Sequence, residues 1–131
     1  MRDKARQWWA RAATDHVAVN RLASEDPLPV AETLLFTAHD AGEKFLKAAL
    51  LASGLPRVHT HDLDRLVREV TQIRPDLRKV QRSATILNDY GIEYRDVNRQ
   101  GTREDIELAL AALGEIRRGV EPILQAEEGG T

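Results

Sequence analysis

Apolar residues recur every three or four positions through almost the whole chain, which is the spacing of one face of a helix. The clearest case is the alanine-rich stretch 29–53. At about 100° per residue, Leu34, Ala38, Ala41 and Phe45 fall on one side of it. Alternating runs of β-branched and aromatic residues, which would predict strands, do not occur. The sequence therefore predicts an all-α fold.

Prolines and glycines divide this helical pattern into five segments. We expect helices over residues 2–24, from Pro29 to Ser53 with Gly54 as C-cap, from the "THDL" at 60–63, after Pro75, and from Thr102. Short connections favour an antiparallel up-and-down bundle of four long helices plus a short one. The 131 residues suit one domain, which we place at residues 1–126, with residues 127–131 as a disordered tail.

Several helix ends carry recognisable capping residues. Thr60 or His61 is the expected N-cap of the third helix, with Asp62 favoured at the positive end of the helix dipole. Thr102 and Asp105 match a capping box at the start of the fifth helix. Near the other end of that helix, Pro122 predicts a kink or fraying.

The second expected helix is apolar on two adjoining faces, so we expect it to pack against more than one neighbour. One flank, made of Leu35, Gly42 and Leu46, faces either another helix or a partner subunit.

A polar arc on the same helix allows two interpretations. His39 and Glu43 could bind a metal, with His59 or His61 approaching from the following loop. Their spacing matches no defined metal motif, so we predict no metal. We favour an exposed polar arc with ion pairs one turn apart, Glu43–Lys47 and Asp40–Lys44.

Charge is unevenly distributed along the chain. The net charge of −2 conceals +3 over residues 57–103 and −5 over residues 104–131. The middle could therefore present a basic surface to phosphate, although an ordinary solvated mixture explains it as well. The absence of Cys excludes disulfides and thiol chemistry. Without a signal-like N-terminus or an apolar run near ~20 residues, we expect a cytoplasmic protein with no membrane span.

Local motifs for catalysis are absent: there is no Walker loop, GxGxxG, HExxH or GxSxG pattern. His61 and Asp62 could act as an acid–base pair or simply cap a helix, and both readings stay open. Arg11 and His16 have Arg-x4-His spacing. Their side chains would lie about 140° apart on a helix, so we interpret the match as chance.

Tyr90 and Arg95 offer a further candidate surface around the polar loop 91–101. Tyrosine can stack on a base and arginine can grip a phosphate with two hydrogen bonds. Local features favour the alternative, in which Tyr90 packs at a helix end and Arg95 is solvated.

Two stretches together resemble the HEPN family, the higher eukaryotes and prokaryotes nucleotide-binding domain. These are "HDAGEKFLKAALLASGLPRVHTHDLDRLV" at 39–67 and "LNDYGIEYR" at 87–95. The similarity extends over about residues 5–124 and implies an α-helical bundle that commonly dimerises. In one branch, small stand-alone members accompany a minimal nucleotidyltransferase in a toxin–antitoxin-like pair. In the other, they are metal-independent ribonucleases with an Arg-x4–6-His motif paired across the dimer.

This sequence departs from the ribonuclease pattern, because no His lies in its C-terminal half. We therefore predict a non-catalytic, homodimeric nucleotide-binding protein without a cofactor, paired with a nucleotidyltransferase. The alternatives are a ribonuclease toxin acting on RNA through Arg11, His16 or His61, and a purely structural partner subunit. The expected ligand-binding residues are Lys44, Lys47, His61, Asp62, Tyr90 and Arg95.

Overall fold

The computed structural model describes residues 2–91 and 100–129. Its elements in chain order are α1 (Arg2–Ala23), the 3-10 turn η1 (Leu28–Val30), α2 (Ala31–Ala52), α3 (Leu63–Thr71), the 3-10 turn η2 (Pro75–Val80), α4 (Gln81–Gly91) and α5 (Arg103–Gly129). No strand occurs among the described residues. The predicted all-α bundle is confirmed, with α3 and α4 the shortest of these α-helices.

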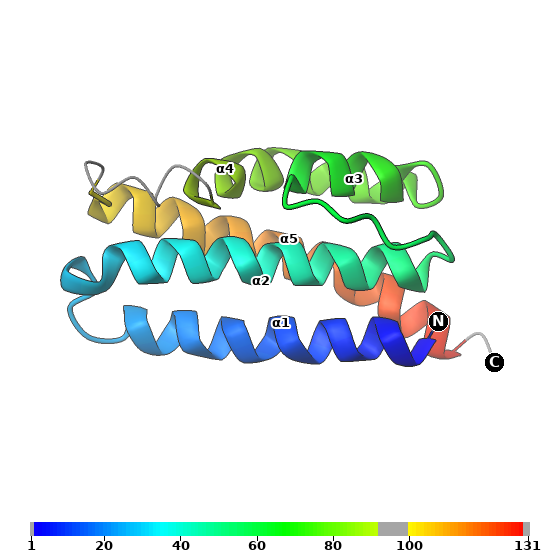
Figure 1. Ribbon diagram of the computed structural model, residues 1–131, viewed down its shortest axis with the longest axis horizontal. Helices are drawn as coiled ribbons and strands as arrows, with labels where there is room; N and C mark the ends of the chain where they lie inside the picture. Colours follow the sequence, from blue (N-terminus) through cyan, green and yellow to red (C-terminus); the bar gives the residue numbers. More distant parts are fainter. Residues whose placement is uncertain (1, 92–99, 130–131) are drawn as a thin grey trace.

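α2 is the central helix of the bundle. It runs antiparallel to α1 on one side, has α3 and α4 on the other, and has α5 behind it in the view of Figure 1. Its two apolar faces therefore meet different neighbours, as its sequence predicts. Leu34, Ala38, Ala41 and Phe45 are all fully buried.

The second apolar flank of α2 packs inside the chain. Leu35 and Leu46 are fully buried. A Cβ added to Gly42 would lie 2.9 Å from Leu87 Cδ1 on α4 and 3.2 Å from Leu63 Cδ2 on α3. Glycine thus lets the helices approach closely, and of the two possibilities for this flank the structure selects another helix.

The predicted caps at two helix ends are present. Gly54 has a φ of 78°. The amides of Gly54 and Leu55 donate to the carbonyls of Leu51 and Leu50 at 3.0 and 3.1 Å, which completes a Schellman motif. At the start of α5, Thr102 Oγ1 accepts from the Asp105 amide at 3.1 Å. Asp105 Oδ2 accepts from the Thr102 amide at 3.0 Å.

The N-cap of α3 differs from the prediction: it is Asp62, not Thr60 or His61. Asp62 Oδ1 accepts from the Arg65 amide at 3.3 Å. Thr60 Oγ1 accepts from the Asp62 amide at 3.1 Å, so its hydroxyl stabilises the turn before the helix and does not cap the helix itself. The carboxylate also reaches Asn88 on α4, which gives it a second partner that favours this role.

α5 continues past Pro122 to Gly129, so it does not end at the proline. The tail predicted at 127–131 overlaps the end of this helix, and residues 130 and 131 lie outside the described part. None of the described helices is long and apolar enough to cross a membrane.

Candidate functional site

The polar arc of α2 is largely buried, which corrects the exposed arc predicted from sequence. His39, Glu43 and Lys47 are only 4%, 7% and 5% exposed. The helical spacing placed these residues together correctly but could not show that the neighbouring elements cover them. The predicted Glu43–Lys47 pair is present, because Lys47 Nζ donates to Glu43 Oε2 at 2.8 Å. The other carboxylate oxygen, Oε1, accepts from His61 Nδ1 at 2.8 Å.

Lys44 does not pair with Asp40 as predicted. Its Nζ donates to Asp15 Oδ2 on α1 at 2.6 Å. Of the expected cationic group, Lys47 and His61 therefore meet at Glu43, whereas Lys44 ties α2 to α1. Both lysines already have a carboxylate partner, which leaves them less available for phosphate.

The other expected ligand-binding residues have partners outside this cluster. Asp62 caps α3. The hydrogen bond from Asn88 has the largest effect on the pKa of Asp62 and lowers it; burial comes next and raises it, and the Arg65 and Asp64 amides and the charge of Arg68 lower it further. Tyr90 is 4% exposed and its hydroxyl donates to Asp105 Oδ1 at 3.3 Å, in keeping with packing at a helix end. Arg95 lies outside the described residues.

Arg11 and His16 turn to different neighbours, as expected for a chance match. The Arg11 guanidinium lies 5.9 Å from the Trp8 ring centroid. Arg117 on α5 donates to His16 Nδ1 at 3.0 Å. Burial, and then the positive charge of Arg117, lower the pKa of His16.

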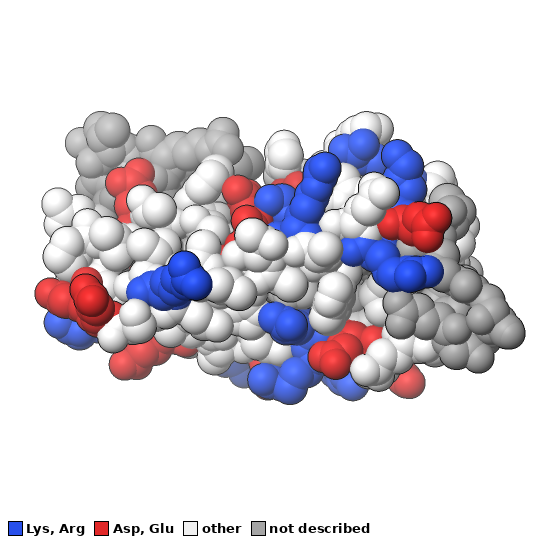
Figure 2. Space-filling view, turned by 90° about the horizontal axis from the view of Figure 1, so that it is seen from below, with Lys and Arg blue, Asp and Glu red and all other residues white. Residues whose placement is uncertain are grey.

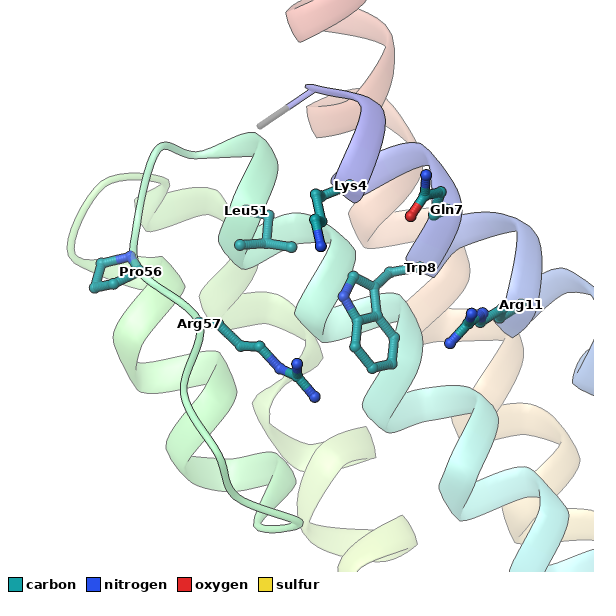
Figure 3. A pocket seen from close by; sticks show the side chains of 7 residues that line it. All are labelled: Lys4, Gln7, Trp8, Arg11, Leu51, Pro56 and Arg57. Atoms are coloured by element: carbon teal, nitrogen blue, oxygen red, sulfur yellow. The ribbon is translucent and has the colours of Figure 1, made fainter.

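A basic pocket opens between the first half of α1, the end of α2 and the loop that follows (Figure 3). We call it the Trp8 pocket. It has a volume of about 420 Å³, and its walls include Lys4, Gln7, Trp8, Arg11, Pro56 and Arg57. In the described part of the chain, no carboxylate lines it. Figure 2 shows lysine and arginine side chains gathered over the half of this face where α1 begins.

Three cations surround the ring of Trp8. The charged groups of Arg57, Lys47 and Arg11 lie 5.1, 5.3 and 5.9 Å from its centroid. Sequence reasoning missed this pocket. The spacing of Lys4, Trp8 and Arg11 on one helix face was a usable signal, but Arg57 joins them through a loop whose path has no periodicity to follow.

A second cavity, of about 650 Å³, lies on the other side of Glu43 from Lys47, and we call it the His61 pocket. Its lining residues are His39, His59, Thr60, His61, Asp62, Asn88 and Asp89. No lysine or arginine is among them. The two pockets thus differ in character: one presents cations around an aromatic ring, and the other presents imidazoles and carboxylates.

A comparison with known families gives one match. The model of the HEPN domain matches residues 5–123, which is most of the chain. No curated protein and no solved structure matches.

Proposed function

Because the chain belongs to the HEPN domain family, we propose that it is a non-catalytic nucleotide-binding protein whose ligand occupies the Trp8 pocket. The observation that carries this proposal is the ring of Trp8, which has Arg57, Lys47 and Arg11 around it and borders a cavity that no described carboxylate lines. Its volume of about 420 Å³ falls within the range of about 300–1,000 Å³ usual for small-molecule sites.

The chemistry of a nucleotide suits this arrangement. Arginine forms paired hydrogen bonds with phosphate oxygens, and Lys4 adds a point charge at the edge of the pocket. A base can stack on Trp8 if one of the covering cations turns toward the phosphates instead. Arg57 is the best placed to do so, because it is exposed and lies on the loop between α2 and α3.

This proposal places the ligand in the Trp8 pocket and not at most of the residues that the sequence predicted to bind it. Among the residues predicted from the sequence to bind the ligand, Lys47 also lies beside Trp8. Lys44 is held by Asp15, and Tyr90 is buried against Asp105. These internal contacts favour structural roles for both side chains.

The assembly expected for the chain is part of the same proposal. We propose a cytoplasmic homodimer that pairs with a minimal nucleotidyltransferase, and the resemblance of the helix–loop–helix at 39–67 to such members supports it. Light scattering at several concentrations tests the dimer. Co-purification with a nucleotidyltransferase expressed beside it tests the partner, and a monomer that retains no such protein would refute this part.

Titration calorimetry with ATP tests the nucleotide site. We expect Arg57→Ala to weaken binding about tenfold or more, because a hydrogen bond to a charged group contributes about 1.5–3 kcal/mol. Arg82→Ala is the matched control, since Arg82 is also exposed but lies on α4. Equal affinities in the two variants, or no binding by the unaltered protein, would overturn the site. RNA cleavage in EDTA that is lost in His61→Ala would overturn the non-catalytic part.

A further inference from the structure

The geometry points to a second site, which the proposed nucleotide function does not use. Against the expectation from ligand spacing, we infer that a divalent transition-metal ion binds at the edge of the His61 pocket, through its lining residues His39 and His61 and through Glu43, which contacts His61. Zn²⁺ is the ion that best fits two imidazoles and a carboxylate.

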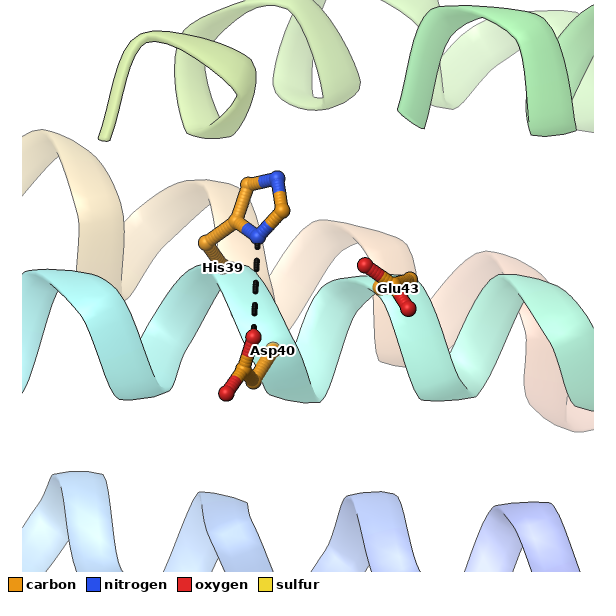
Figure 4. A group of neighbouring side chains, drawn as sticks. All are labelled: His39, Asp40 and Glu43. Atoms are coloured by element: carbon orange, nitrogen blue, oxygen red, sulfur yellow. Dashed lines mark ion pairs between the residues drawn. The ribbon is translucent and has the colours of Figure 1, made fainter. Parts of the chain in front are cut away.

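His39 supplies the first observation. It is 4% exposed, yet within the described residues its ring makes no hydrogen bond. Its nearest charged atom is Asp40 Oδ1, 3.8 Å from Nδ1, which is too far for one (Figure 4). Buried polar groups are nearly always hydrogen-bonded, so a buried imidazole that lines a cavity and has only the distant Asp40 beside it calls for a ligand.

The position of the His39 ring is fixed by close packing. A Cβ added to Gly91 would lie 2.6 Å from His39 Nε2, so only glycine leaves room for the ring there. The backbone at the end of α4 therefore covers Nε2, and Nδ1 is the nitrogen directed toward Asp40. Such packing holds a ligand in place before the ion arrives.

Glu43 lies between the other candidate ligands and contacts both His61 and the neighbourhood of His39. One ligand atom from each of His39, Asp40 and Glu43 lies within 4.8 Å of the others. Glu43 Oε1 is also 2.8 Å from His61 Nδ1. Zinc bonds of about 2.0–2.2 Å require ligand atoms roughly 3–4 Å apart, so the exposed side chain of His61 must turn toward His39 to complete the site.

The charges around the site favour a cation. Asp62 and Asp89 line the pocket, and within residues 2–91 and 100–129 no lysine or arginine does. Lys47 binds Oε2 of Glu43, which leaves Oε1 for the ion. On binding, the ion replaces the proton on His61 Nδ1, which leaves to solvent.

Calorimetric titration of the full chain with Zn²⁺, free of any histidine tag, tests this inference. We expect one ion per chain in the unaltered protein. His39→Gln and His61→Gln should each weaken binding at least tenfold, because each removes a direct ligand. His16→Gln is the matched control, since His16 is a partly buried histidine bound to Arg117, and it should not change the affinity.

Co²⁺ in place of Zn²⁺ gives a second readout, because visible absorption reports its coordination. We expect the bands of a nitrogen- and oxygen-coordinated ion, which His61→Gln alters. The side chain of His61 is 78% exposed, so this variant should fold even where His39→Gln does not. Absent binding, or equal binding in all the variants, would overturn the site. So would binding that depends on His59 and His61 but not on His39, which would mean surface chelation only.

Discussion

Lys47 and Glu43 form the most buried ion pair among the described residues, with side chains only 6% and 9% exposed. Taking two charges out of water is costly, and their attraction compensates only while both partners remain. Removing one partner leaves an isolated charge in a poorly solvated place. The pair is therefore more sensitive to single substitutions than the exposed pairs on the surface.

Lys47→Met should lower the free energy of unfolding by about 3 kcal/mol, the lower end of the range for breaking a buried pair. We choose the lower end because His61 still donates to Glu43. Urea unfolding at neutral pH measures the change. The double variant Glu43→Gln with Lys47→Met should recover part of the loss, because no charge is then left behind. A single-variant loss below about 1 kcal/mol would contradict this account.

His16 should make the fold sensitive to mild acid. Its pKa in the folded chain is lowered from the ordinary value of 6.5, first by burial and then by Arg117. A lowered histidine pKa means that its contribution is complete above about 6.5 and is lost as the pH falls through the folded-state pKa. His16 is only partly buried, so screening by solvent keeps the effect small.

Thermal melts from pH 7.5 to pH 5 measure this effect. His16→Gln should flatten the acid side of the stability curve, because the substituted side chain does not titrate. All other titratable groups are the same in both proteins, so the difference between their stability curves gives the contribution of His16. Parallel curves over this range would show that Arg117 and burial do not bias the protonation of His16.

At the scale of the elements, the start of α3 depends on Asp62 and its two neighbours. The Asp62 carboxylate accepts a hydrogen bond from the Arg65 amide and a second one from the side-chain amide of Asn88 on α4. The Asn88 side-chain oxygen in turn accepts from the backbone amide of Leu63 at 2.9 Å. Asp62→Ala should cost about 1 kcal/mol, the usual effect of removing an N-cap. Thr60→Ala should cost less, since Thr60 holds only the turn before the helix.

Asp62→Ala should also change how the free energy of unfolding depends on pH. The pKa of Asp62 is lowered by Asn88 and the amides, so its stabilisation is present above the ordinary carboxyl range and is lost as pH falls through the lowered value. Chemical unfolding at pH 7 and at pH 3 compares the two variants. Equal costs for Asp62→Ala at both values, or a larger cost for Thr60→Ala, would refute this assignment of the cap.

At the scale of the whole molecule, the sequence predicted what depends on local spacing. The helices, the cap at Gly54 and the box at Thr102 and Asp105 involve residues within about one helical turn of each other. The choice of Asp62 over Thr60 depended on Asn88, which is 26 residues away. Such contacts between distant segments have no periodic signal.

Burial of the polar arc was missed for the same reason. Helical geometry placed His39, Glu43 and Lys47 on one side of α2, and the structure agrees. Whether that side meets water depends on where the loop after α2 and the helix α4 lie, and spacing does not determine either. The Trp8 pocket was missed likewise, because Arg57 reaches it from that loop.

The Lys47–Glu43 pair also connects the two pockets. Lys47 Nζ lies 5.3 Å from the Trp8 ring and 2.8 Å from Glu43 Oε2. Glu43 Oε1 lies 2.8 Å from His61, where the second pocket begins. An anion bound in the Trp8 pocket would attract Lys47 away from Glu43, and the carboxylate would then be more available to a cation.

We therefore predict that the two ligands strengthen each other's binding, by about fivefold or 1 kcal/mol, the lower end of typical coupling. Zn²⁺ titrations with and without saturating AMP, at buffered free Zn²⁺, measure the factor. Linkage requires that Zn²⁺ raise the affinity for AMP equally. Lys47→Met should abolish the coupling while leaving a Zn²⁺ site, provided circular dichroism shows the variant folded. Independent binding in the unaltered protein, or coupling that survives in Lys47→Met, would show that this ion pair does not link the pockets.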